Sequence, residues 1–173
     1  NVFHLDDTEG IKAKYTKELP NIAEPSAEAD RIITDYLSRS GVKLSHEEGN
    51  QAYYQPSTDR IVLPLREQFT STAEYYSTAF HELTHSTGHA KRLNRLTTGI
   101  KAAFGGEEYS KEELTAEIGA ASLLNHLGIE TPDSFRNSAA YIQSWLKALR
   151  GDARMIVAAA SRAEKAVAYI LGA

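Results

Sequence analysis

Residues 81–85 read His81-Glu82-Leu83-Thr84-His85, and this pentapeptide decides how the remaining sequence is interpreted. Two histidines four residues apart lie on one face of a helix, with their Cβ atoms roughly 5–6 Å apart, so both imidazoles can reach one ion. Glu82 projects from the rim of that face, where its carboxylate can hold and deprotonate a metal-bound water. The spacing is typical of zinc peptidases. It predicts a metal site with His81 and His85 as ligands and Glu82 as the catalytic base.

The residues before and after the pentapeptide predict that it lies on a helix. The run 71–74, Ser-Thr-Ala-Glu, has the form of a capping box, in which Ser71 accepts from the backbone N–H of Glu74 and Glu74 reaches back. Apolar residues recur at helical spacing through residues 76–87, and Gly88 suits a left-handed C-terminal cap. We therefore expect a capped amphipathic helix that carries the metal-binding residues.

The whole chain has the composition of a soluble globular domain. Its 173 residues are 42% hydrophobic and 24% charged, and no apolar run approaches the roughly 20 residues that span a bilayer. The chain has no cysteine, so a zinc ion must be held by histidines and carboxylates, and the absence fits a reducing cytoplasm. A net charge of -4 indicates no broad surface for nucleic acid. We expect one domain over residues 1–173, and the opening Asn1 suggests that it is a fragment of a longer protein.

The pattern of apolar residues predicts an α+β fold. Helices are expected at 26–40, 110–127, 138–150 and 152–171, and strands at 2–5, 42–46, 51–55 and 60–63. Three strands directly before the motif helix predict a small antiparallel sheet packed on a mostly helical body, with the metal site on two facing helices. Ile61-Val62-Leu63 is the candidate edge strand for pairing with an extended peptide. The basic run 91–95 favours a solvated face over a phosphate or partner site.

The third metal ligand must come from outside the pentapeptide, because a catalytic zinc needs three protein ligands and one open position for water. Glu113 is the first candidate, since it lies on a later helix that can fold back to face the first. Glu117, four residues on, would then accept the free N–H of a ligand histidine. Two alternatives stay open. Glu117 is the ligand, or Glu113 only caps its helix, because Ser110-Lys111-Glu112-Glu113 is itself a capping-box pattern.

Two further residues are candidates for the rim of the site. His89 continues the four-residue spacing and is an alternative ligand, but Gly88 is expected to end the helix before it, which suggests a position at the site rim or in a local cap. Tyr109 lies one helical turn before Glu113, and its phenol could stabilise a developing oxyanion. A packing role for Tyr109 is the alternative.

With these residues in view, the chain resembles the zincin-like metallopeptidase domain of ArdC-type antirestriction and polyvalent proteins of mobile elements. The resemblance extends to other gluzincin-type peptidases, where Glu113 matches the third ligand. The family typically carries an aromatic residue where Ser86 stands here. The matching stretches are Val2–Leu5 with Glu9-Gly10, Phe80–His89, Arg92–Arg95, Tyr109–Ala120 and Tyr141–Leu146.

The resemblance implies a cytoplasmic protein that helps incoming mobile DNA escape host restriction. It also implies an N-terminal domain that binds single-stranded DNA and would lie outside this chain. The expected cofactor is Zn²⁺, with Mn²⁺ open as the alternative, and the expected substrate is a protein or peptide.

Two functions of different classes follow from the sequence. The first is a zinc-dependent endopeptidase, active or latent, in which Glu82 takes a proton from the metal-bound water and delivers it to the leaving amine. The second is a non-catalytic binding module with a structural metal that sequesters DNA or a host protein. An open fourth metal position favours the first function, because structural zinc sites are closed.

Overall fold

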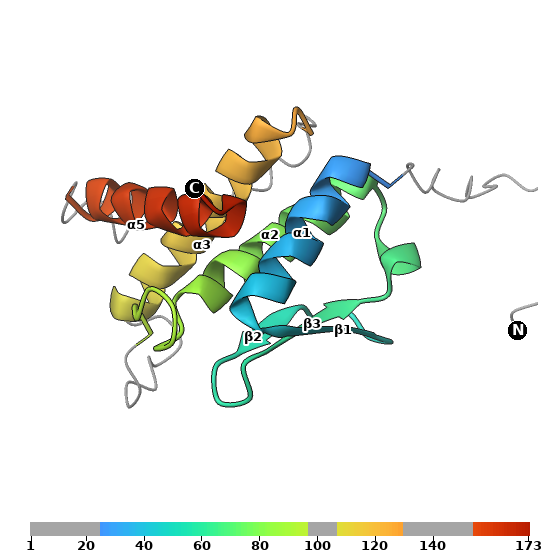
Figure 1. The fold of residues 1–173 in the computed structure, drawn as a ribbon, viewed down its shortest axis with the longest axis horizontal. Helices are drawn as coiled ribbons and strands as arrows, with labels where there is room; N and C mark the ends of the chain where they lie inside the picture. Colours follow the sequence, from blue (N-terminus) through green and yellow to red (C-terminus); the bar gives the residue numbers. More distant parts are fainter. Residues whose placement is uncertain (1–24, 97–106, 130–153) are drawn as a thin grey trace, which may run out of the picture.

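The computed structural model describes residues 25–96, 107–129 and 154–173, and it confirms an α+β fold (Figure 1). The expected strand 2–5 and helix 138–150 lie outside these residues. No helix of the described ranges is long and apolar enough to cross a bilayer. In chain order, the elements are α1 (Ala27–Ser40), β1 (Lys43–Glu47), β2 (Tyr53–Gln55), β3 (Arg60–Pro64), the 3-10 helix η2 (Arg66–Gln68), α2 (Thr72–Thr87), α3 (Glu107–His126) and α5 (Arg154–Leu171).

The sheet is mixed, with the strand order β1-β3-β2. The expected antiparallel pairing is found between β2 and β3, whose hairpin turns at Pro56-Ser57-Thr58-Asp59, but β1 runs parallel to β3. The expectation that Ile61-Val62-Leu63 forms an edge is wrong, because β3 is the central strand. Its residues from Ile61 to Leu63 are at most 3% exposed. Such a continuous apolar run is typical of a strand that is covered on both faces.

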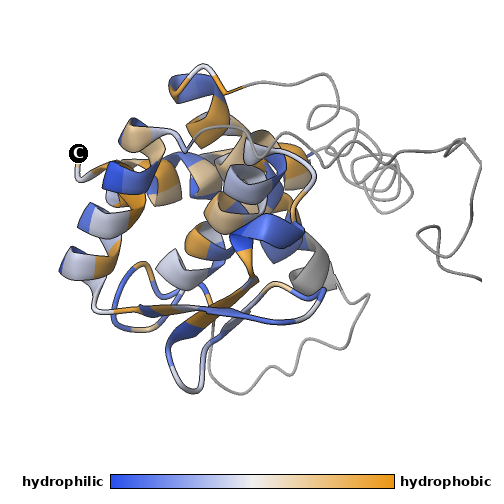
Figure 2. Ribbon diagram, turned by 90° about the vertical axis from the view of Figure 1, so that its right-hand side faces the viewer, coloured by the Kyte–Doolittle hydropathy of each residue, from blue (hydrophilic) through white to orange (hydrophobic). Residues whose placement is uncertain are grey.

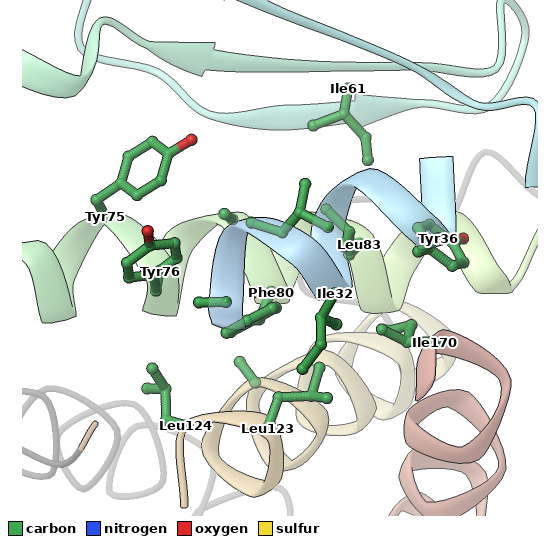
Figure 3. Close-up of a cluster of buried hydrophobic side chains, with 14 of the residues drawn as sticks. Ile32, Tyr36, Ile61, Tyr75, Tyr76, Phe80, Leu83, Leu123, Leu124 and Ile170 are labelled. Atoms are coloured by element: carbon green, nitrogen blue, oxygen red, sulfur yellow. The ribbon is translucent and has the colours of Figure 1, made fainter. Parts of the chain in front are cut away.

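The helices and the sheet enclose the larger of the two clusters of buried hydrophobic residues in the described part of the chain. Figure 1 shows the sheet on one side of α1 and α2, with α3 and α5 on their other side, and Figure 2 shows hydrophobic residues on the helix sides that face inward. In Figure 3 the labelled core side chains of α1, β3, α2, α3 and α5 converge. Those with almost no exposed surface include Tyr36 of α1, Ile61 of β3, Phe80 and Leu83 of α2, Leu123 of α3 and Ile170 of α5.

The first helix has the expected start and end. Ser26 accepts from the backbone N–H of Ala29 through its Oγ at 3.3 Å, and Gly41 adopts a left-handed φ of 72°. Its aromatic residue Tyr36 is buried, and the Tyr36 hydroxyl lies 2.6 Å from Oγ of Ser86 on α2. Ser86 therefore takes part in a buried hydrogen bond.

The motif helix α2 begins as expected and ends differently. Ser71 Oγ accepts from the Glu74 N–H at 3.1 Å, whereas the Glu74 carboxylate reaches back to the N–H of Thr70 at 2.9 Å. The expectation of a left-handed cap at Gly88 is wrong, because its φ is -73°. Glycine is needed there because a side chain would have too little space. An added Cβ would lie 2.9 Å from Cγ of Leu96 and 3.1 Å from the backbone carbonyl oxygen of His85. The chain after α2 thus folds closely back over the helix end.

The two arginine side chains of the basic run 91–95 are buried although Lys91 and Asn94 are exposed, so the expectation of a solvated face is wrong for Arg92 and Arg95. The Arg92 side chain is 1% exposed; it pairs with Asp59 of the hairpin turn and donates to the Ser86 carbonyl at 2.7 Å. The Arg95 side chain is 8% exposed and pairs with Glu112 of α3. The cause is that a guanidinium has five donors, which here bind carbonyls near the ends of helices and carboxylates of neighbouring elements.

A close approach of α2 and α3 places the two halves of the candidate site opposite each other. At Gly119 of α3, an added Cβ would lie 2.7 Å from both Cγ2 and Oγ1 of Thr84. Thr84 is fully buried and belongs to the pentapeptide. Glycine at position 119 therefore lets α3 approach α2 closely. This approach sets the distance between the histidines of α2 and the acidic residues of α3.

Candidate metal centre

Three predicted ligands come together between α2 and α3. Nε2 of His85 lies 3.0 Å from Nε2 of His81 and 3.3 Å from Oε1 of Glu113, and His81 Nε2 lies 3.6 Å from Oε2 of Glu113. Zinc bonds of about 2.0–2.2 Å at tetrahedral angles place ligand atoms about 3.3 Å apart. The three donor groups therefore fit one divalent ion. In the described part of the chain, these three residues form the group whose donor atoms are close enough to share a metal.

The start of α3 removes one of the sequence alternatives for Glu113. The helix begins at Glu107, so Ser110 lies inside it and cannot be its N-cap. A capping role for Glu113 at this helix start is therefore excluded. Glu113 instead lies in the second turn, with its carboxylate directed at both histidine Nε2 atoms.

Each histidine has a second carboxylate at its other ring nitrogen. His81 Nδ1 lies 3.3 Å from Oε1 of Glu117, and His85 Nδ1 lies 3.3 Å from Oε1 of Glu112. A carboxylate at Nδ1 fixes the tautomer, because Nδ1–H donates to it and the lone pair of Nε2 stays free for an ion. Glu117 thus lies where the sequence predicts a partner of a ligand histidine.

Sequence reasoning missed the role of Glu112. Its signal was available: two ligand histidines need two Nδ1 partners, and Glu112 and Glu117 flank Glu113 on the same helix. The capping-box pattern at residues 110–113 gives no sign of this role, whereas the need for one Nδ1 partner per ligand histidine points to Glu112.

The carboxylates make the cluster a strong attractor of positive charge. Burial alone would lower the pKa of His81, but the hydrogen bonds to Glu113 and Glu117 raise it to about 10. Burial alone would also lower the pKa of His85, but the hydrogen bonds to Glu112 and Glu113 raise it. A metal ion competes with these protons, so uptake of an ion releases protons.

Glu82 is buried beside the two histidines, at 7% exposure. Burial raises the pKa of its carboxyl group, and the positive charge of His85 and His81 and a backbone hydrogen bond from Tyr54 of β2 oppose that shift. A carboxylate with a raised pKa is a better proton acceptor near neutral pH. The contact with Tyr54 also brings strand β2 next to this residue.

His89 and Tyr109, the two candidates for the rim of the site, lie in different parts of the chain. His89 follows the end of α2, and its Nδ1 accepts from the backbone N–H of Lys91 at 3.2 Å, outside the group of three donors. This bond lies within the turn that follows α2, and the roles of His89 as a rim group or a cap stay predictions. Tyr109 lies in the first turn of α3, and its side chain is outside the described part of the structure.

Comparison with known proteins connects this site with one family. The family model described as a zincin-like metallopeptidase matches residues 27–162. Two Escherichia coli proteins named DNA primase TraC are 46% and 41% identical over 170 residues. These alignments cover 98% of this chain, and 11% and 15% of the primases. An uncharacterized protein, y4eC of Sinorhizobium fredii, is 35% identical over 95% of this chain and 50% of its own length.

Solved structures show the same fold. The Mn(II)-bound antirestriction protein ArdC of plasmid R388 has a TM-score of 0.68 and 36% identity, covering 95% of this chain and 57% of that protein. Its metal-free structure has a TM-score of 0.62 and 37% identity, and the likeness covers 85% of this chain and 50% of that one. The chain thus spans little more than half the length of ArdC and much less of the primases.

Proposed function

The chain belongs to the zincin-like metallopeptidase family, and on that premise we propose that it hydrolyses peptide bonds with one divalent metal ion. The observation that carries the proposal is the convergence of His81, His85 and Glu113 beside the buried carboxylate of Glu82. Three protein donors leave a coordination position for water, whereas a structural zinc site uses four. The arrangement of the described residues therefore favours a hydrolytic centre.

The proposed cofactor is Zn²⁺ or Mn²⁺. Two imidazoles and one carboxylate are a donor set that catalytic zinc accepts, and ArdC has been crystallised with Mn(II). When bound, such an ion supplies Lewis acidity, which polarises a carbonyl group and lowers the pKa of a coordinated water to about 7.

The residues of the chain would then have separate tasks. The Glu82 carboxylate accepts a proton from the attacking water and delivers it to the leaving amine, so that water is added across the broken C–N bond. Glu117 and Glu112 hold the Nδ1 protons of His81 and His85 and keep both Nε2 atoms directed at the ion. For Tyr109 we retain the sequence prediction of a hydrogen bond to the developing oxyanion.

Strand β2 is the proposed surface for an extended substrate. It is an edge of the described three-stranded sheet, and the backbone of its residue Tyr54 lies close enough to Glu82 to oppose the rise in the pKa of that carboxyl group. A peptide that pairs with β2 would therefore pass the proposed base. The Tyr54 side chain holds β2 to the hairpin turn, because its hydroxyl donates to Asp59 at 2.8 Å.

We further propose that this domain works in the cytoplasm inside larger proteins of mobile elements. The support is the similarity to an antirestriction protein of a plasmid and to proteins named DNA primase, of which it spans 57% or less. Contact with single-stranded DNA would fall to other parts of such proteins. The alternative function, a binding module that sequesters DNA or a host protein around a structural ion, uses the same ligands without needing Glu82.

Removal of the metal tests the proposed function. Treatment with a chelator followed by its removal is expected to lower cleavage of an unfolded, fluorescently labelled protein by at least about 100-fold, because the ion supplies several kcal/mol of transition-state stabilisation. One equivalent of Zn²⁺ or Mn²⁺ should restore the rate. Cleavage that survives metal removal contradicts the proposal, and a metal-loaded chain that cleaves nothing supports the binding module.

A further inference from the structure

We propose that Arg95 is a positioning residue of the metal centre, which holds Glu112 so that Glu112 orients the ligand His85. The inference rests on the metal site of the proposed function, but it does not depend on peptidase activity.

The three residues form one continuous chain of contacts. Nε of Arg95 donates to Oε2 of Glu112 at 3.2 Å, and one of its terminal nitrogens donates to Oε1 at 2.9 Å. The same Oε1 lies 3.3 Å from Nδ1 of His85. A forked pair of this kind fixes the plane of a carboxylate as well as its charge. The oxygen that meets the histidine therefore has a defined position.

The guanidinium is also fixed to the helix that carries the histidines. Arg95 donates to Oγ1 of Thr87 at 2.7 Å and to the Thr84 carbonyl at 2.8 Å, both in the second half of α2. The Arg95 N–H donates to the Gly88 carbonyl at 2.9 Å, and an added Cβ at Gly88 would lie 3.2 Å from the guanidinium. The Arg95 side chain thus links α2 to α3 next to His85.

Charge explains why an arginine is needed there. The Glu112 side chain is 12% exposed, and a buried carboxylate without a countercharge is strongly unfavourable. Glu112 also shares the centre with the carboxylates of Glu113 and Glu117, which repel it. Without Arg95, Glu112 would gain by turning toward solvent, and His85 would lose the partner that keeps its Nε2 directed at Glu113.

Arg92 offers a matched control on the same segment. Its side chain is 1% exposed and also forms an ion pair, but its partners are Asp59, the Tyr54 hydroxyl and the carbonyls of Ser40 and Ser86. Loss of either arginine should lower the free energy of unfolding. Loss of Arg95 should in addition change the metal centre.

The test measures metal binding of the full chain by competition with a chromophoric chelator, together with the visible absorption of the Co²⁺-loaded protein. Arg95→Met and Glu112→Gln are each expected to weaken Zn²⁺ binding about 10- to 100-fold and to alter the Co²⁺ spectrum. The double variant should bind Zn²⁺ little more weakly than either single variant, because both substitutions act through one contact. Arg95→Lys should regain part of the affinity, since it keeps the charge but loses the fork.

Arg92→Met is expected to bind Zn²⁺ within about threefold of the unchanged chain, since none of its partners is a ligand or an Nδ1 partner. If Arg92→Met or Arg95→Met does not fold, Arg92→Lys serves as the control. The test then uses two single variants, Arg95→Lys and Glu112→Gln. The proposal is overturned if these Arg95 and Glu112 variants keep the affinity and the Co²⁺ spectrum. It is equally overturned if the Arg92 variant weakens binding as much. A chain without peptidase activity would leave these readouts valid.

Discussion

Replacement of Glu82 by glutamine is expected to slow peptide cleavage by about 100- to 10,000-fold while Zn²⁺ remains bound. The amide has nearly the shape of the carboxylate but cannot accept the proton of the attacking water. Glu82 is not among the three donors, so Zn²⁺ affinity should change little. Because Glu82 is buried, loss of its charge should leave the free energy of unfolding unchanged or raise it.

Glu74→Gln is the matched control for this experiment. Glu74 lies on the same helix, and its carboxylate accepts from Thr70 at the start of α2, far along the helix from the histidines. This variant should lose only a little stability and keep its cleavage rate. If Glu82→Gln cleaves as fast as Glu74→Gln, Glu82 is not the base. If it also keeps the full biological effect of the protein, the binding-module alternative gains.

The second large effect is expected at the third ligand. Glu113→Gln should weaken Zn²⁺ binding by well over 100-fold, because the carboxylate that faces both Nε2 atoms is lost. Glu117→Gln should weaken it only about 10- to 100-fold, as expected for a group that orients a ligand from behind. Both substitutions remove one charge from neighbouring turns of α3, so each serves as the control for the other.

The order of these two effects decides the question that the sequence leaves open. Zn²⁺ affinities from chelator competition, measured on chains whose folding is checked by circular dichroism, give the comparison. A larger loss from Glu117→Gln than from Glu113→Gln would assign the ligand to Glu117 and reverse the roles of the two residues.

The elements that sequence reasoning predicted well are those fixed by local patterns. The stripe of α1, the Ser71 cap of α2 and the two-histidine spacing all depend on neighbours within a few residues along the chain. Glu113 could be proposed because metal chemistry demands a third donor and because two acidic residues four apart share a helix face.

The features that were missed depend on contacts between distant segments. The order of the strands is not encoded in any one strand, so the sequence predicts an edge at β3 although β1 and β2 both pair with it. The burial of Arg92 and Arg95 depends on which carboxylates and carbonyls the folded chain brings to them. A run of charges in a sequence does not contain that information.

The central claim is that His81, His85 and Glu113 hold one divalent ion with a coordination position left for water. Crystals of the chain grown with Zn²⁺, with diffraction data collected on both sides of the zinc absorption edge, test it most directly. We predict one anomalous peak about 2.0–2.2 Å from Nε2 of both histidines and from a Glu113 oxygen, with a non-protein ligand in the remaining position. No peak between these side chains, or an ion closed off by a fourth protein ligand, would contradict the claim.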